Sequence, residues 1–131
     1  MLKPGGAFAR FANHPNRDPN RPEMHEALQE VYAVYMPGTR NDKIYGEEEA
    51  RERAEAAARY GFVDIQYKLY HRVRTFTAAE YVQLLCTYSD HVALEEEKRK
   101  RFFAEICQVI ERLGGEISIY DTLDLQLARR P

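Results

Sequence analysis

A regular alternation of apolar and polar residues near the middle of the chain constrains its fold more than any other feature. It runs from Val63 to Val73, with Ile65, Tyr67 and Leu69 set between polar neighbours. Successive side chains of a β-strand point to opposite faces, so this period of two indicates a strand with its apolar residues on one face. The segments on both sides follow a helical period instead, and a chain that interleaves the two patterns is expected to form α/β layers.

Helical patterns fill the segments between the expected strands. Apolar residues recur at helical spacing from Pro22 to Tyr35, and small residues do so from Ala50 to Ala58, before Gly61 as the expected C-terminal cap. Thr77 with a glutamate three residues later is a capping-box pattern, which predicts that another helix begins there. A long amphipathic helix is predicted from Glu95 to Leu113.

Two further strands are predicted, one near each end of the chain. The first is Ala7 to Ala12, followed by an expected loop from Asn13 to Pro22, and the last runs from Ile117 to Leu127. Asp121 falls among the apolar positions of the last strand, which marks a bulge, a turn or the wall of a pocket. The 131 residues are therefore predicted to form a single α/β domain with a three-stranded mixed sheet and flanking helices.

The composition excludes several classes of function. The formal net charge is −2 at pH 7, so no strong field would draw the chain to nucleic acid or to an anionic membrane. No apolar run approaches the roughly 18 to 20 residues of a membrane span, and no secretory signal is visible. We therefore expect a cytoplasmic protein with Cys86 and Cys107 reduced. The histidines and cysteines lack metal-ligand spacing, so no metal site is predicted.

The first strand poses a problem for so narrow a sheet. Ala7 to Ala12 is apolar on both faces, a pattern typical of a strand inside a sheet. A three-stranded sheet has two edges, and an apolar strand at an edge is a template for pairing with another chain. The sequence thus predicts that something is missing on the N-terminal side, with Met1 as a true start, a misassigned start or a fragment boundary as the open explanations.

Several motifs resemble those of class I methyltransferases that depend on S-adenosylmethionine. Leu2-Lys3-Pro4-Gly5-Gly6 looks like the turn into their fifth strand, and Tyr60-Gly61-Phe62 looks like the turn into their sixth. The more specific stretch runs from Arg74 to His91 and reads Arg-Thr-Phe-Thr, then Tyr-Val-Gln-Leu-Leu, then Thr-Tyr-Ser-Asp-His. It resembles a stretch of the bacterial type 11 methyltransferase-like group, and Leu125 to Arg129 fits the same pattern.

The resemblance implies a partial Rossmann-like methyltransferase fold, namely the C-terminal half that faces a small-molecule acceptor. Its last strand would lie between the other two and run antiparallel to both. The family binds its cofactor with a glycine-rich loop between a strand and a helix, and no such run follows a strand here. S-adenosylmethionine is thus the implied cofactor, but we expect this chain alone to bind none and to be inactive alone.

The resemblance places the candidate site around the segment from Arg74 to His91. Arg74 would hold an acidic acceptor through paired hydrogen bonds, the tyrosines would stack on a planar acceptor, and His91 would act as the catalytic base. The predicted substrate-binding residues are Arg74, Tyr81, Thr87, Tyr88 and Ser89, together with Asn13 and His14 at the end of the first strand. The alternative is that the tyrosines pack in the core and His91 caps a loop.

Two other functions stay open at this point. One is a non-enzymatic module that associates with itself, and the other is a small-ligand binding protein derived from the same fold. We favour a homodimer through the first strand, Ala7 to Ala12, or through apolar surface, because the contact would satisfy backbone groups and bury apolar area. A separate chain that carries the N-terminal half is the alternative partner.

Overall fold

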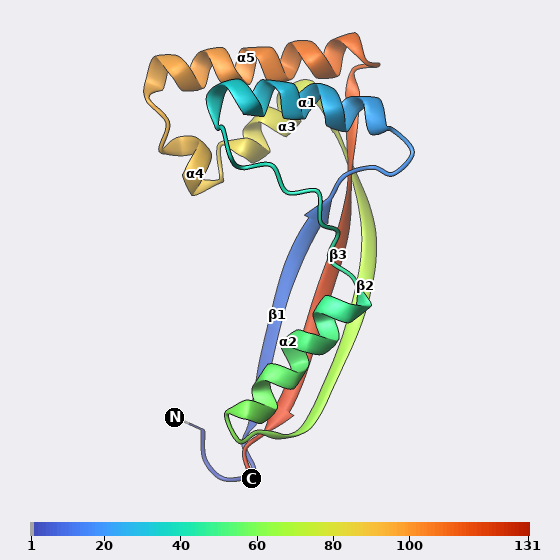
Figure 1. Cartoon of the computed structure of the whole chain (residues 1–131), viewed down its shortest axis with the longest axis vertical. Helices are drawn as coiled ribbons and strands as arrows, with labels where there is room; N and C mark the ends of the chain where they lie inside the picture. Colours follow the sequence, from blue (N-terminus) through green and yellow to red (C-terminus); the bar gives the residue numbers. More distant parts are fainter. Residues whose placement is uncertain (1) are drawn as a thin grey trace. The chain divides into compact units, whose positions relative to one another are not determined.

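The computed structural model describes residues 2–131, which form three strands and five helices (Figure 1). In chain order these are β1 (Ala7–Asn16), α1 (Pro22–Tyr35), α2 (Glu47–Arg59), β2 (Val63–Thr77), α3 (Ala78–Leu85), α4 (Ser89–Val92), α5 (Glu96–Arg112) and β3 (Glu116–Arg129). The predicted α/β interleaving is confirmed. Among these described residues, none of the helices combines the length and the apolar character needed to cross a bilayer.

The three strands form one sheet in the order β1-β3-β2. β1 runs antiparallel to β3, from Ala7 opposite Arg129 to Asn16 opposite Tyr120. On the other side of β3, the Arg72 side chain bonds to Asp121 and the Thr75 side chain bonds to Ser118. Because residue numbers rise along β2 as they fall along β3, these two strands also run antiparallel. The predicted place and direction of the last strand are confirmed. Every hydrogen-bonded pair is antiparallel, and β1 and β2 share a direction without pairing with each other.

β1 continues past the strand that the sequence predicts. It reaches Asn16, so Asn13, His14 and Pro15 pair with β3 instead of forming the expected loop. A proline lacks the N–H that a ladder needs, but β1 is an edge strand, where a proline is tolerated. The expectation of a loop from Asn13 onward is therefore wrong, and the loop begins at Arg17.

The chain divides into two compact units. The strand unit comprises the N-terminal segment to Asn16, residues 43–73 and residues 120–131, and the helix unit comprises residues 17–42 and 74–119. Both β2 and β3 contribute residues to each unit. The prediction of a single domain stays a prediction.

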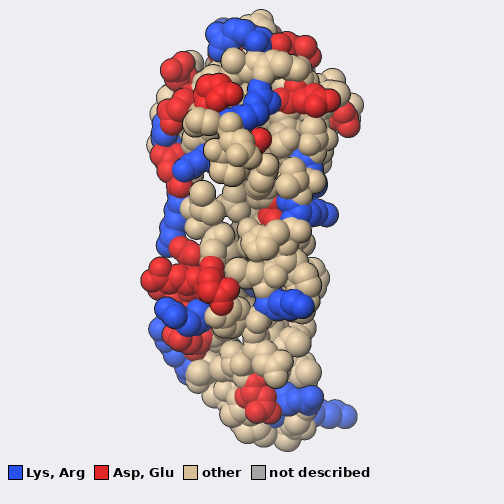
Figure 2. Space-filling model, turned by 90° about the vertical axis from the view of Figure 1, so that its right-hand side faces the viewer, with Lys and Arg blue, Asp and Glu red and all other residues tan. Residues whose placement is uncertain are grey.

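The helix unit is built around an apolar core. α1 and α3 both pack against α5, and the two longer helices lie side by side in Figure 1. The helical spacing of apolar residues on α5 brings them to one face, which is buried. The buried core residues are Met24, Leu28 and Val31 of α1, Ala78 and Leu85 of α3, Phe102, Ile106, Val109 and Ile110 of α5, and Ile117 of β3. Acidic and basic side chains intermingle on the outer face of this unit that Figure 2 shows.

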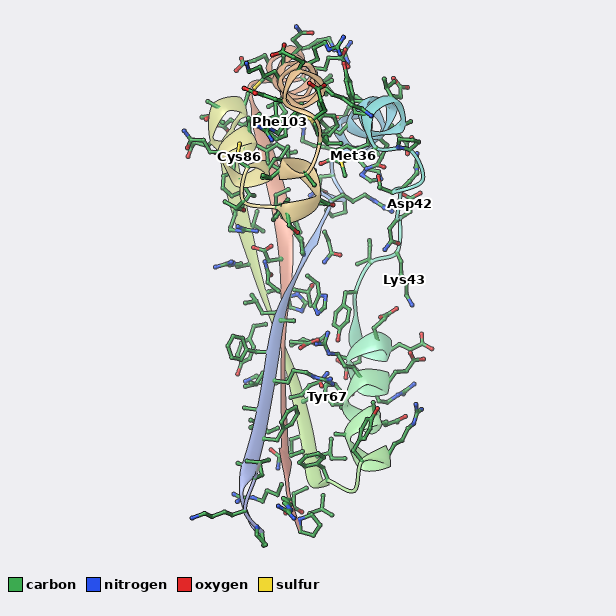
Figure 3. All side chains as sticks on the ribbon, turned by 90° about the vertical axis from the view of Figure 1, so that its left-hand side faces the viewer. Met36, Asp42, Lys43, Tyr67, Cys86 and Phe103 are labelled. Carbon is green, nitrogen blue, oxygen red and sulfur yellow. The ribbon has the colours of Figure 1, made fainter. Side chains whose placement is uncertain are left out.

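The strand unit covers its sheet with α2, but the covered face is polar. Ala50 and Ala54 of α2 are buried, and so are Asp124 and Gln126 of β3. Figure 3 shows Tyr67 of β2 reaching toward α2, where its hydroxyl donates to Glu47 at 2.6 Å.

The opposite face of the same sheet carries apolar side chains and has no helix of the strand unit over it. On β1, Phe11 is 80% exposed, and on β3 Leu127 is 40% exposed. Leu123 and Leu125 share that face of β3 because they stand two and four residues before Leu127. The alternation of the last strand therefore groups its residues as expected, but its leucines form the open face.

A glycine in the left-handed region ends α2, as the sequence predicts. Gly61 has φ 85°, its N–H donates to Ala58, and the N–H of Phe62 donates to Ala57, which is the Schellman pattern. We expect Gly61→Ala to lower the free energy of unfolding by about 1 kcal/mol in urea titrations, because a Cβ is strained against its own backbone at this φ. Gly61→Asn is the matched control and should lose less, since asparagine tolerates this region better. Equal losses for the two variants would contradict the explanation.

Candidate functional site

The segment with the predicted site begins at a capped helix in the helix unit. The Thr77 hydroxyl accepts the N–H of Glu80 at 3.2 Å, and the Glu80 carboxylate accepts the N–H of Thr77 at 3.1 Å. The predicted capping box is thus confirmed. After α3 ends, the Thr87 hydroxyl donates to the carbonyl of Leu84 at 2.6 Å, and the chain turns into α4. This turn places His91 against the core.

His91 is buried and both of its ring nitrogens have partners. Nε2 lies 2.7 Å from the Tyr32 hydroxyl, and Nδ1 lies 2.7 Å from Oδ1 of Asp90. Burial raises the pKa of Tyr32 well above its usual range, so the hydroxyl stays protonated and donates to Nε2. The hydrogen bond to His91 lowers the pKa of Asp90, which suits a carboxylate that accepts from Nδ1. Asp90, His91 and Tyr32 therefore form one chain of hydrogen bonds that leads from the surface into the core.

The two predicted tyrosines line the rim of the same core. Tyr81 and Tyr88 are half-buried against it, and the Tyr88 ring lies 5.6 Å from that of His91. Desolvation, with a smaller contribution from Tyr88, raises the pKa of Tyr81 to about 12. Both tyrosines thus match the alternative in which they pack in the core, although each keeps part of its surface open.

Arg74 is brought close to this rim by an aromatic residue that sequence reasoning did not single out. Its guanidinium carbon lies 5.4 Å from the centre of the Phe76 ring, a distance at which a cation and a ring attract. The Phe76 ring in turn lies 6.4 Å from that of Tyr81. Thr87 and Ser89 are exposed, and the Thr87 hydroxyl already donates a hydrogen bond to the backbone carbonyl of Leu84. The structure therefore assembles Arg74, Phe76 and Tyr81 as neighbours.

Asn13 and His14 belong to the strand unit and serve opposite faces of its sheet. As neighbours on β1 they point in opposite directions. Asn13 Nδ2 donates to Oδ1 of Asp121 at 3.1 Å, and Arg72 Nε donates to Oδ2 of Asp121 at 2.9 Å. Asp121, which the pattern marks as out of place, is thus a buried carboxylate held by cross-strand partners.

On the covered face, four residues form what we call the Asp124 cluster: His14, Tyr45, Arg53 and Asp124. Oδ2 of Asp124 lies 3.0 Å from Nε2 of His14 and 3.8 Å from Nη1 of Arg53, and it accepts the Tyr45 hydroxyl. The Tyr45 ring stacks on the His14 ring, with centres 3.5 Å apart and planes 4° from parallel. Desolvation and the bond to Asp124 raise the pKa of Tyr45 to about 12, so this hydroxyl stays a donor.

The other oxygen of this carboxylate is unusual. Within residues 2–131, Oδ1 of Asp124 is a buried side-chain oxygen without a hydrogen-bond partner. Sequence reasoning missed Asp124, Tyr45 and Arg53. The only available signal was an acidic residue between two leucines on the last strand, whereas Tyr45 and Arg53 reach the cluster from a polar connection and a charged helix.

Between residues 2 and 131, the turns do not provide a cradle for S-adenosylmethionine of the kind that the resembling family uses. Such a cradle needs a glycine-rich loop between a strand and a helix, where backbone N–H groups approach the ligand. β1 leads to α1 through residues 17–21, which contain no glycine, and β2 runs directly into α3. The residues present therefore do not fit this cofactor, and its failure to bind the chain alone stays a prediction. Residues 2–131 also contain no group of three metal-ligating side chains placed to hold an ion.

Comparisons with known proteins find similarity at the level of structure. No protein-family model matches the chain, and no curated protein matches it. One solved structure, described as a candidate methyltransferase from Bacillus halodurans, is similar over 99% of this chain at 18% sequence identity and a TM-score of 0.40. The chain spans 58% of the length of that protein.

The bond between Tyr32 and His91 should stabilise the helix unit. We expect Tyr32→Phe to lower the free energy of unfolding by about 1–3 kcal/mol, because it leaves Nε2 of a buried histidine without its donor. Tyr35→Phe on the same helix is the matched control, since the Tyr35 hydroxyl donates to Glu105 nearer the surface. Chemical unfolding of the two variants measures the difference, and a loss no greater for Tyr32→Phe than for Tyr35→Phe would refute the assignment.

Proposed function

We propose that this chain is the acceptor-side, C-terminal portion of a methyltransferase that uses S-adenosylmethionine to methylate a small molecule, and that it is inactive alone. The arrangement of the sheet supports the proposal most. β3 lies between β1 and β2 and runs antiparallel to its β1 partner, which is the order that the motifs at Gly5-Gly6 and Gly61 imply by resemblance. This order joins the two ends of the chain at one sheet.

The acceptor site that we propose is formed by Arg74, Phe76, Tyr81 and Tyr88. A guanidinium beside an aromatic ring presents a planar cation, which suits the carboxylate of an aromatic acid. The partly open tyrosine rings add flat apolar surface for the rest of such a molecule. His91 would act as a base only by exchanging its bond to Tyr32 or Asp90 for one to the acceptor.

A non-enzymatic, self-associating module is the second candidate, and one observation favours it. The open face of the strand unit exposes Phe11, which stands opposite Leu125 in the β1–β3 ladder, while Ala9 stands opposite Leu127. β1 also offers a free sheet edge. We propose that a second copy of the chain covers this face, because a two-fold dimer would place the same apolar residues against each other. A separate chain with the N-terminal half is the alternative cover.

Isothermal titration tests the acceptor site and the missing cofactor site together. We expect no heat from S-adenosylmethionine, since no strand-to-helix turn offers a glycine-rich cradle, and measurable binding of aromatic carboxylates such as benzoate derivatives. Arg74→Ala should abolish the carboxylate binding, whereas Arg51→Ala, which removes a surface pair with Glu55, should not. Clear micromolar binding of S-adenosylmethionine, or an Arg74→Ala variant that behaves like wild type, would count against the proposal.

Sedimentation velocity tests the dimer. We expect the wild-type chain to sediment as a dimer at high concentration and Phe11→Glu to shift it to the monomer, because a carboxylate would be buried on the apolar face. Val34→Glu is the matched control, since Val34 on α1 is 68% exposed but belongs to the helix unit. A wild-type chain that stays monomeric at high concentration would rule out self-association.

A further inference from the structure

The Asp124 cluster holds one histidine in a fixed orientation. Asp124 is 1% exposed, so its carboxylate is anchored inside the strand unit, and it holds the imidazole by accepting a hydrogen bond from Nε2 of His14 at Oδ2. The stacked Tyr45 ring sets the plane of the imidazole. Because an ionised carboxylate can only accept, Nε2 carries the hydrogen and the lone pair of the neutral ring lies on Nδ1.

The second ring nitrogen of His14 stays available, and the side chain is partly exposed. Within residues 2–131, Nδ1 of His14 has no hydrogen-bond partner, and the His14 side chain is 22% exposed. Among residues 2–131, none of the other three histidines pairs with a buried carboxylate. Nδ1 of His71 lies 3.4 Å from the Thr122 hydroxyl. His91 has both nitrogens engaged, and His25 pairs with Asp42, whose side chain is 47% exposed. A histidine oriented by a buried carboxylate, with the opposite nitrogen open, is the arrangement that general-base catalysis uses.

We propose that His14 is a proton acceptor, positioned by Asp124, for an O–H or N–H group of a small molecule that binds at the strand unit. The X–H bond of that molecule breaks, its electron pair stays on X, and the proton goes to the lone pair of Nδ1. The resulting imidazolium forms an ion pair with the buried carboxylate. Tyr45 and Arg53 also lie beside that carboxylate. A second histidine, His71 of β2, contacts Thr122, which stands opposite His14 in the ladder.

The carboxylate of Asp124 has few donors around it. A buried carboxylate needs donors or positive charge to offset its lost hydration. Oδ1 has no donor, and Arg53 lies at 3.8 Å from Oδ2, beyond hydrogen-bonding distance. The protonated imidazole supplies a full charge at 3.0 Å from Oδ2. An imidazolium formed by the proposed proton transfer would therefore lie beside this carboxylate as its ion-pair partner.

Two measurements on the whole chain test the proposal, and neither involves S-adenosylmethionine or methyl transfer, so its failure is separate from that of the proposed function. The first is long-range ¹H–¹⁵N correlation of the histidines above neutral pH. We expect His14 to show hydrogen on Nε2 and a bare Nδ1. A spectrum with the hydrogen on Nδ1 would overturn the assignment, and this measurement needs no variant.

The second measurement uses 4-nitrophenol, whose anion absorbs visible light. Near neutral pH, where a neutral imidazole can accept a proton, the protein should raise the absorbance of the anion, because His14 takes the phenolic proton of the bound probe. His14→Gln and Asp124→Asn should abolish the rise, and His25→Gln should leave it unchanged. No rise with the wild-type chain, or the same rise with His14→Gln, refutes the proposal.

Discussion

The hydrogen-bond ladders of β3 tie together parts of the chain that lie far apart in sequence. Ala7 pairs with Arg129 across the sheet, and beyond that pair Gly5 and Gly6 bond to the backbone of Arg130. These contacts join residues more than 100 positions apart. Forming them therefore costs the conformational entropy of closing a loop of nearly the whole chain. β3 comes last in the sequence, and neither β1 nor β2 has a strand partner without it. The order of the sheet thus depends on this one central strand.

The strand unit combines this ladder with an unusual distribution of polarity. Its covered face contains Asp124 and Gln126, while Phe11 and the leucines of β3 lie on the open face. Buried carboxylates destabilise a fold unless donors or opposite charges surround them. Asp121 pairs with Arg72, and Asp124 pairs with His14. These pairs offset part of the cost of burying the two carboxylates. Polar groups kept inside at such a cost are typical of sites under functional constraint.

The helix unit follows the more usual rule of an apolar core with one polar chain inside it. There the sequence singled out several residues that the structure places near one another, and their role as a site stays a prediction. Tyr81, Tyr88 and His91 do lie at one core. His91 points inward because α4 packs it near the Phe102 ring, and no local sequence pattern predicts that contact. In the strand unit His14 was predicted as a substrate-binding residue after the first strand, but its partners Asp124, Tyr45 and Arg53 come from three distant segments. Contacts of that kind have no signature in a single sequence.

What the sequence by itself determined is local: the period of each element, the capping box at Thr77, the left-handed glycine at Gly61 and the interleaved order of helices and strands. Each of these depends on residues within a few positions of one another. The tertiary structure decided which face of the sheet is covered, how far β1 extends and where the carboxylates of β3 find partners. A period of two groups residues by face, but the position of α2 determines which face is buried. Pro15 joins a strand only because β3 offers a ladder at the sheet edge.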